Sequence, residues 1–320
     1  MIPHELAPRL LKLPESDGQT IVIMTCSDPR HVYFAYRLQK EFGDSVVAWY
    51  QYKQPSLKRE GGSRIHYIQK IIKKVMNKKD MTPEKLKAII VNDGIVSFVK
   101  KSLTSMYAMF MERSAKNKYL KKKSLIEKQL FSAEITRLEK YVKHEPRTVS
   151  YPNSPEFIAE IQELNPYFFL ILGGPLYCNE LISKVKGIAI NQHAGWSPQV
   201  KGSGIFPPLY NRNLEHIGST IHVVTSGADT GPVLRRSNAA LVEWDTPESC
   251  ALRTVILGTE LMVEVVKDFL SDKEVFVFDQ PSGIGKTYLG SSVDRDMMKT
   301  VYKDFSVGWL KKELNRMRKF

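Results

Sequence analysis

The sequence has few cysteines and only short apolar runs, and both shortages restrict the kind of protein it encodes. Cys26, Cys178 and Cys250 are the three cysteines in 320 residues, and their wide spacing matches no metal-ligand pattern, so we expect no metal site. Such usage is typical of a reduced, cytoplasmic protein. The longest apolar runs, such as residues 168–172, are too short to cross a bilayer. The first 19 residues lack a basic region followed by an apolar block, so we expect no signal peptide.

Acidic residues are scarce in one part of the chain. The whole sequence has 47 Lys and Arg against 34 Asp and Glu. Residues 51–150 hold 24 of the basic and 9 of the acidic residues, whereas the other 220 residues are nearly neutral, with 23 and 25. A general affinity for nucleic acid would spread basic residues over the whole chain. This distribution therefore predicts one module that contacts an anionic partner.

Alternating strands and helices predict an α/β protein. Residues 19–26 and 45–52 have the apolar runs of buried strands, and residues 27–43 between them have the spacing of an amphipathic helix. This β-α-β order predicts a parallel sheet with helices on its faces. Beyond Pro155 the alternation returns, with helices expected over 155–165, 179–185 and 246–272 and strands over 167–172, 187–193 and 218–224.

The stretch between these two parts breaks the alternation. Residues 63–79 have one apolar helical face, residues 87–94 resemble a short strand, and residues 104–143 predict a long basic helix. We interpret residues 62–147 as a basic, mostly helical insertion. Such a segment is most often a solvated face over a core, and the alternatives are contact with phosphates or with anionic lipid headgroups. Aromatic and basic residues are not interleaved as in single-strand binders, so nucleic acid is not the favoured partner.

Polar residues gather where two of the expected strands end. Asn191 and His193 are two residues apart in a strand, so their side chains point to the same face. Asp229 follows the strand over 218–224, in the glycine-flanked loop SGADTG, where the backbone turns tightly. Each residue alone has a structural explanation: a strand cap, a core histidine and a turn aspartate. What indicates a functional site is that the three residues occur together, in this order and at this spacing.

This set of residues resembles the folate-dependent formyltransferase family, which includes glycinamide ribonucleotide, methionyl-tRNA and sugar-amine formyltransferases. The family motif is Asn-x-His at a strand end, a Pro-x-x-x-Gly loop, a Gly-x-Thr-x-His-x-Val strand and an Asp-x-Gly loop. The chain supplies Asn191 and His193, Pro198 and Gly202, residues 218–224, and Asp229 with Gly231. The resemblance is clearest over residues 165–270. It implies a doubly wound, mainly parallel α/β sheet, Rossmann-like and of the formyltransferase type.

The resemblance also implies an activity: transfer of a formyl group from 10-formyltetrahydrofolate to a primary amine, without a metal. Asn191 would donate to the developing oxyanion with His193 as its partner. Asp229 would raise the pKa of His193, or take up the proton of the amine. His222 and Thr220 are expected to pack under the site as structural residues, with a direct role as the alternative. The folate ring would lie against two loops. Its contacts would be Gly174, Leu176 and Tyr177 in the first loop, and Ser226, Gly227 and Ala228 in the second. The alternative is that the first loop is only a tight strand-to-helix turn.

The acceptor amine is less constrained. Gly195, Ser197 and Lys201 depart from the family pattern in the loop near the acceptor. The 48 residues after position 272 are too few for the β-barrel of methionyl-tRNA formyltransferases, and the regulatory domain of formyltetrahydrofolate hydrolases is absent. With these two classes set aside, and because the basic segment favours an anionic substrate, we expect the acceptor to be a nucleotide-linked amino sugar used in surface glycans such as lipopolysaccharide. The alternatives are another amine such as methionyl-tRNA, hydrolysis of formyltetrahydrofolate, and a non-catalytic binding module.

These inferences divide the chain into four parts. Residues 1–61 and 148–272 are expected to form the catalytic core, residues 62–147 the insertion, and residues 273–320 a short α+β extension. The sequence SGIGKT (282–287) resembles part of a phosphate-binding loop, but position 280 is Gln where that loop requires Gly, so we expect no nucleotide-hydrolase site. The oligomeric state stays open, and a homodimer is compatible with the sequence.

Overall fold

The chain forms two compact units in a computed structural model. The structure describes residues 8–15, 18–53, 83–202, 204–271, 273–281, 283–289 and 292–318. One unit comprises residues 1–53 and 118–320, and the other comprises residues 54–117. The helix predicted over 63–79 lies outside the described residues. The predicted limits of the insertion, 62 and 147, stay a prediction.

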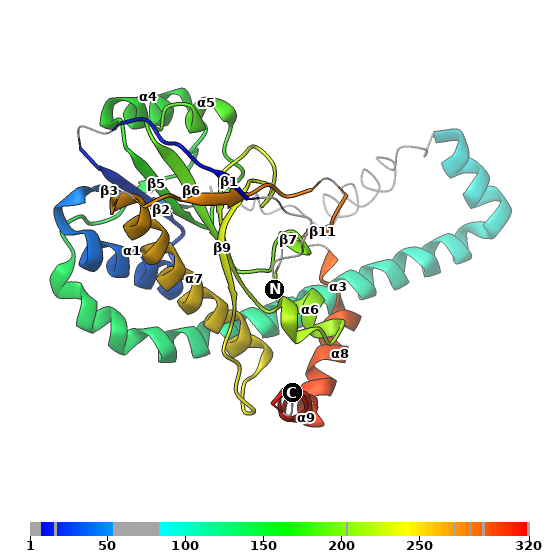
Figure 1. Ribbon diagram of the computed structural model, residues 1–320. Coiled ribbons are helices and arrows are strands. Elements are labelled where there is room, and N and C mark those ends of the chain that lie inside the picture. The colour runs from blue at the N-terminus through cyan, green and yellow to red at the C-terminus, as the bar shows by residue number, and fades with distance from the viewer. Residues whose placement is uncertain are drawn as a thin grey trace. The chain divides into compact units, whose positions relative to one another are not determined.

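The larger unit is built on a twisted sheet (Figure 1). Its strands are β1 (Pro8–Leu10), β2 (Ile21–Thr25), β3 (Val46–Tyr52), β4 (Arg147–Val149), β5 (Phe168–Leu172), β6 (Ile188–His193), β8 (Gly218–Val223), β9 (Val233–Asn238) and β10 (Phe276–Phe278). Among the described residues the order is β1-β10-β9-β8-β6-β5-β2-β3-β4. The strands from β6 to β4 are parallel, whereas β8, β9, β10 and β1 extend the sheet in antiparallel pairs.

Helices cover both faces of the sheet. The helical segments are α1 (Pro29–Phe42), η1 (Gly43–Ser45), α3 (Pro83–Leu138), η2 (Glu139–Tyr141), α4 (Pro155–Leu164), α5 (Asn179–Ile182), α6 (Phe206–Tyr210), η3 (Leu214–His216), α7 (Pro247–Leu270), α8 (Arg295–Ser306) and α9 (Trp309–Met317). Successive β2 side chains point to opposite faces. Ile21 and Ile23 pack in the cluster that includes α1 and α7, and Val22 and Met24 pack in the cluster that includes α4 and α5 (Figure 1). The predicted doubly wound α/β fold is confirmed.

Local sequence explains where the main helices begin. The Thr246 hydroxyl accepts a hydrogen bond from the Ser249 amide, the Ser249 hydroxyl accepts one from the Thr246 amide, and Pro247 occupies the first turn of α7. The strand predicted over 87–94 is wrong, because these residues are part of α3. The run of Ile and Val there suggested a strand, but good helix formers surround it and helix formation is cooperative.

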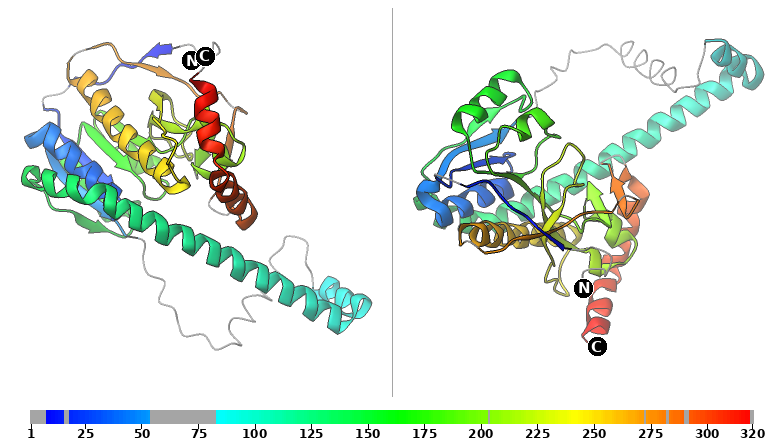
Figure 2. Two further views of the ribbon diagram at one scale, coloured as in Figure 1. Left: turned by 90° about the horizontal axis from the view of Figure 1, so that it is seen from below. Right: turned by 45° about the horizontal axis from the view of Figure 1, so that its top comes forward.

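The end of the chain adds short strands and two helices to the larger unit. β10 joins the large sheet beside β9. A second, two-stranded sheet pairs β11 (Lys286–Tyr288) with β7 (Val200–Gly202). Helix α8 packs against α6 and α7, and α9 follows it (Figure 2). Among the described residues, the next helix after residues 283–287 is α8, which begins at Arg295.

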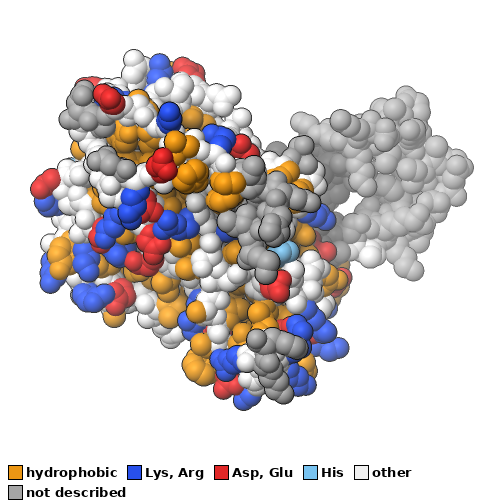
Figure 3. Space-filling model, viewed as in Figure 1, with side chains coloured by type: hydrophobic (Ala, Val, Ile, Leu, Met, Phe, Trp, Pro, Cys, Tyr) orange, Lys and Arg blue, Asp and Glu red, His pale blue; other side chains and the backbone are white. Residues whose placement is uncertain are grey.

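Charged side chains of both signs are mixed on the face of the molecule that Figure 3 shows. Many of them are paired, as in the Arg37–Glu260 pair and the Arg235–Asp268 pair, with nitrogen-to-oxygen distances of 2.9 and 2.6 Å. No helix among the described residues combines the length and the apolar content that crossing a membrane requires.

Candidate active site

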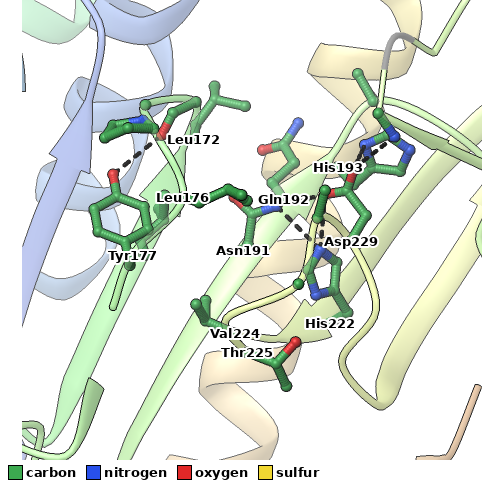
Figure 4. A pocket seen from close by; sticks show the side chains of 18 of the residues that line it. Leu172, Leu176, Tyr177, Asn191, Gln192, His193, His222, Val224, Thr225 and Asp229 are labelled. Atoms are coloured by element: carbon green, nitrogen blue, oxygen red, sulfur yellow. Dashed lines mark hydrogen bonds and ion pairs between the residues drawn. The ribbon is translucent and has the colours of Figure 1, made fainter. Parts of the chain in front are cut away.

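A pocket lies at the carboxyl ends of β5 and β6 (Figure 4). Its volume is 370 Å³, and its walls come from the turn after β5, the end of β6, strand β8 and the loop that carries Asp229. Open α/β sheets bind ligands at this edge, because strand ends and loops from distant parts of the chain meet there. The position of the pocket makes it the candidate site.

Asn191 and His222 face each other across the antiparallel pair of β6 and β8. The two residues are direct register partners, and Asn191 Nδ2 lies 3.0 Å from His222 Nε2. His222 Nδ1 lies 2.8 Å from the carbonyl oxygen of Val223. A proton on Nδ1 satisfies that carbonyl, which leaves Nε2 to accept the Asn191 amide hydrogen. The sequence left open whether His222 only packs under the site or has a direct role, and the structure places it in the polar cluster, opposite Asn191.

Asp229 is the centre of this cluster (Figure 4). One carboxylate oxygen, Oδ2, accepts the Gly202 amide hydrogen at 2.8 Å and lies 3.2 Å from His193 Nδ1. The other, Oδ1, lies 3.3 Å from His222 Nε2 and 3.4 Å from Asn191 Nδ2. The loop holds Asp229 at a φ of 52°, in the left-handed region that aspartate tolerates better than most residues.

The environment of Asp229 favours the ionised carboxylate. Burial alone would raise its pKa, but His193, His222 and the Gly202 amide stabilise the negative charge. Together they hold the pKa of Asp229 well below its usual range. The carboxylate is therefore charged at neutral pH.

His193 is buried, with 6% of its surface exposed. Burial lowers the pKa of His193, Asp229 raises it, and the net direction is downward. Asp229 therefore acts on the pKa of His193 in the predicted direction, but burial outweighs this effect. The ring has an oxygen near each nitrogen, since Val200 O lies 3.0 Å from Nε2 and Asp229 Oδ2 lies near Nδ1. The neutral ring has one proton for these two oxygens, so it can accept a second proton and donate to both.

Thr220 supports the loop after β6. Its hydroxyl donates to the Gly195 carbonyl at 2.7 Å and accepts from the Ser197 amide at 3.1 Å. A Cβ atom at Gly195 would lie 2.1 Å from His193 Nε2, so only glycine fits there without displacing the ring.

The other side of the pocket is formed by the turn after β5. Gly173 and Gly174 have φ values of 82° and 108°, which favour glycine. The Tyr177 hydroxyl donates to the Gly173 carbonyl at 3.3 Å, and burial raises the pKa of that hydroxyl. Leu176 is 56% exposed at the edge. Of the six predicted ring contacts, Gly174, Leu176, Tyr177, Gly227 and Ala228 line the pocket, whereas Ser226 is not among its lining residues.

His31 also lines the pocket, and sequence reasoning did not identify it. It is 4% exposed, and its Nδ1 has no hydrogen-bond partner among the described residues. Burial, with smaller effects of Arg30 and Lys123, lowers the pKa of His31 well below its usual value. Its position in α1, directly after β2, could have indicated a pocket residue, because β2 and β5 are neighbours that end at the same edge.

We predict that His31 makes the protein less stable in mild acid. Below pH 6.5, His31 takes up a proton in the unfolded chain, whereas in the folded protein it stays neutral. The free energy of unfolding therefore has its full value above that pH and declines as the pH falls. The wild type should lose about 1.4 kcal/mol more unfolding free energy than His31→Gln between pH 7.5 and 5.5. Urea unfolding at both pH values measures this difference. His144→Gln, which changes a partly exposed histidine, is the control, and equal losses in the wild type and His31→Gln would contradict the prediction.

Comparison with known proteins gives one family for this region. Residues 114–266 match the formyl transferase family. The methionyl-tRNA formyltransferase of Thermodesulfovibrio yellowstonii is 26% identical over 111 residues, which are 34% of this chain and 36% of that protein. The methionyl-tRNA formyltransferase of Caldanaerobacter subterraneus is 28% identical over 125 residues, 39% and 40% of the two chains. The matched region thus spans less than half the length of these relatives.

Solved structures include similar folds. A sugar N-formyltransferase from Shewanella sp. aligns over 86% of this chain and 78% of its own, with a TM-score of 0.45 and 14% identity. A phosphoribosylglycinamide formyltransferase from Bacillus halodurans aligns over 79% and 96%, with a TM-score of 0.43 and 14% identity.

Proposed function

We propose that this chain, which carries a formyl transferase domain over residues 114–266, transfers a formyl group from 10-formyltetrahydrofolate to a primary amine. The observation that carries the proposal is the cluster of Asn191, His193, His222 and Asp229 at the pocket. It combines an amide donor, an ionised carboxylate and a buried imidazole, which are the groups that formyl transfer to an amine needs.

The pocket fits a flat donor ring. Positive φ angles at Gly173 and Gly174 bring backbone atoms to the pocket surface, and a Cβ atom at Gly174 would lie 2.3 Å from the Tyr177 hydroxyl. Leu172, Val224 and Ala228 add apolar surface. We propose that the turn after β5 and the loop that carries Asp229 hold the folate, which supplies the formyl group.

Asn191 and Asp229 would act on the reacting groups. One Asn191 N–H is held by His222 Nε2, which fixes the plane of the amide. The other makes only a 3.4 Å contact with Asp229, so it can turn to a developing oxyanion at little cost. The ionised Asp229 accepts the proton that the amine loses. His193, neutral and beside Asp229, can accept that proton in turn.

We propose a nucleotide-linked amino sugar as the acceptor. The net positive charge of residues 51–150 supports an anionic, phosphate-bearing substrate. Methionyl-tRNA is the second candidate, supported by the names of the relatives that match this chain. Few, widely spaced cysteines favour the cytoplasm as the location.

Release of folate, followed by absorbance, tests the proposal. Purified protein is mixed with 10-formyltetrahydrofolate and with UDP- or dTDP-linked amino sugars, methionyl-tRNA, or water alone. Turnover with one amino sugar is the expected result. Turnover only with methionyl-tRNA would show that methionyl-tRNA, and not an amino sugar, is the acceptor. Turnover with water alone would indicate a hydrolase. Donor binding without any turnover would contradict the proposed activity.

A further inference from the structure

A segment near the end of the chain contacts both loops that hold the carboxylate of Asp229. We call residues 276–281 and 283–288 the C-terminal brace. It begins with β10, which pairs with β9 through Phe278 and Val233 and so anchors the brace to the large sheet. It ends with β11, which pairs with β7 beside the pocket. Between these two strands lies Gln280.

Gln280 binds the backbone of the loop that carries Asp229. Its side-chain amide donates to the carbonyl of Asp229 at 2.9 Å and to the carbonyl of Gly231 at 2.6 Å. The first acceptor belongs to Asp229, the residue with the positive φ, and the second lies two residues further along the loop. A Cβ atom at Gly231 would lie 1.8 Å from the Val223 carbonyl oxygen, so the loop is also packed closely on β8. Gln280 therefore fixes the backbone that aims the carboxylate.

β11 holds the second loop, which supplies the other contacts of the cluster. The Lys286 amide donates to the Gln199 carbonyl at 3.1 Å, and Lys286 to Tyr288 are register partners of Val200 to Gly202. Two of these β7 residues contact the site directly, because Val200 O lies near His193 Nε2 and the Gly202 amide donates to Asp229.

Glycines permit this close approach. A Cβ atom at Gly285 would lie 1.8 Å from the Pro198 carbonyl oxygen, and one at Gly202 would lie 2.3 Å from the Tyr288 carbonyl oxygen. Both glycines have positive φ, 74° and 80°. The two short strands thus lie together in a way that few other residues would allow.

We propose that the C-terminal brace is a positioning element of the site, with Gln280 as its central residue, and that it holds Asp229 and β7 in their working geometry without contacting substrate. The proposal rests on the proposed formyl transfer for its kinetic consequence. Its structural consequence, order in the two loops, does not depend on that activity.

The test compares Gln280→Met with the wild type. Methionine keeps the length of the side chain and removes both N–H donors. Gln162→Met, on the exposed side of α4, is the matched control. We expect amide hydrogen exchange over residues 196–206 and 225–234 to become about tenfold faster in Gln280→Met, with β5 unchanged. We expect kcat to fall about 10- to 100-fold while KM for the folate donor stays within about twofold, because misplaced groups slow the reaction more than they weaken binding.

A second variant keeps the test decisive if Gln280→Met does not fold. Lys286→Pro removes the amide that donates to Gln199 and leaves Gln280 in place, so faster exchange should be concentrated in residues 196–206. Unchanged exchange in both loops would overturn the proposal, and so would faster exchange with unchanged kcat. If the wild type transfers no formyl group to any acceptor, the proposed function fails, and exchange alone decides whether the brace orders the site.

Discussion

Asp229→Asn is expected to lower kcat for formyl transfer by about a thousandfold, the largest single effect in this chain. The neutral amide cannot take up the proton of the attacking amine. It also cannot repeat the contacts of the carboxylate, because its NH2 group would be a donor facing either the Gly202 amide or the Asn191 amide, both of which donate to the carboxylate oxygens. Steady-state kinetics with saturating donor and acceptor measure the loss.

The control for this variant is Asp44→Asn, which removes a carboxylate whose side chain is 93% exposed and does not line the pocket. It should leave kcat unchanged. The affinity of Asp229→Asn for a folate analogue should stay within a few-fold of the wild type, since the proposed ring contacts are made by other residues of the two loops and not by the Asp229 carboxylate. A residual kcat above about one tenth of the wild type would show that Asp229 does not handle the proton.

Asn191→Ala should lower kcat by about a hundredfold to a thousandfold, the usual effect of removing one donor to an oxyanion. KM for both substrates should change little, because the donor acts mainly in the transition state. The variant also leaves His222 Nε2 without its amide donor. The same kinetic assay, run at several pH values, separates loss of the donor from a change in the titration of the cluster.

Asn211→Ala is the matched control for Asn191, because Asn211 is exposed at the end of α6. It should have wild-type kinetics. A kcat for Asn191→Ala equal to that of Asn211→Ala would exclude Asn191 from the reaction. In that case the amide would serve only to join β6 to β8.

The apolar parts of the fold could be predicted from the sequence. Runs such as residues 167–172 are buried on both faces of the sheet, so their composition alone identifies them as central strands. The end of β6 could also be predicted as a site, because Asn191 and His193 are polar residues at the end of such a run. The structure places both at the pocket with Asp229.

The parts that sequence reasoning missed are short, polar and held by long-range contacts. β7 and β11 have three residues each and carry little apolar pattern, so they exist only because they pair with each other across 83 or more intervening residues. The role of Gln280 depends on two backbone carbonyls about fifty positions away. The pKa of His193 could not be predicted either, because the degree of burial decides its direction.

The pairing of β1 with β10 has a consequence for the order in which the protein folds. Arg9 and Val277 are register partners, so this edge of the sheet joins residues from nearly opposite ends of the chain. Contacts of such separation close large loops and form slowly. On the ribosome, β2, β3 and β5 are synthesised long before β10. We therefore expect a nascent chain to assemble its parallel core early and to complete the segment around Gln280 only after synthesis has passed it. Formation of the core and maturation of the site would then be separate events in time.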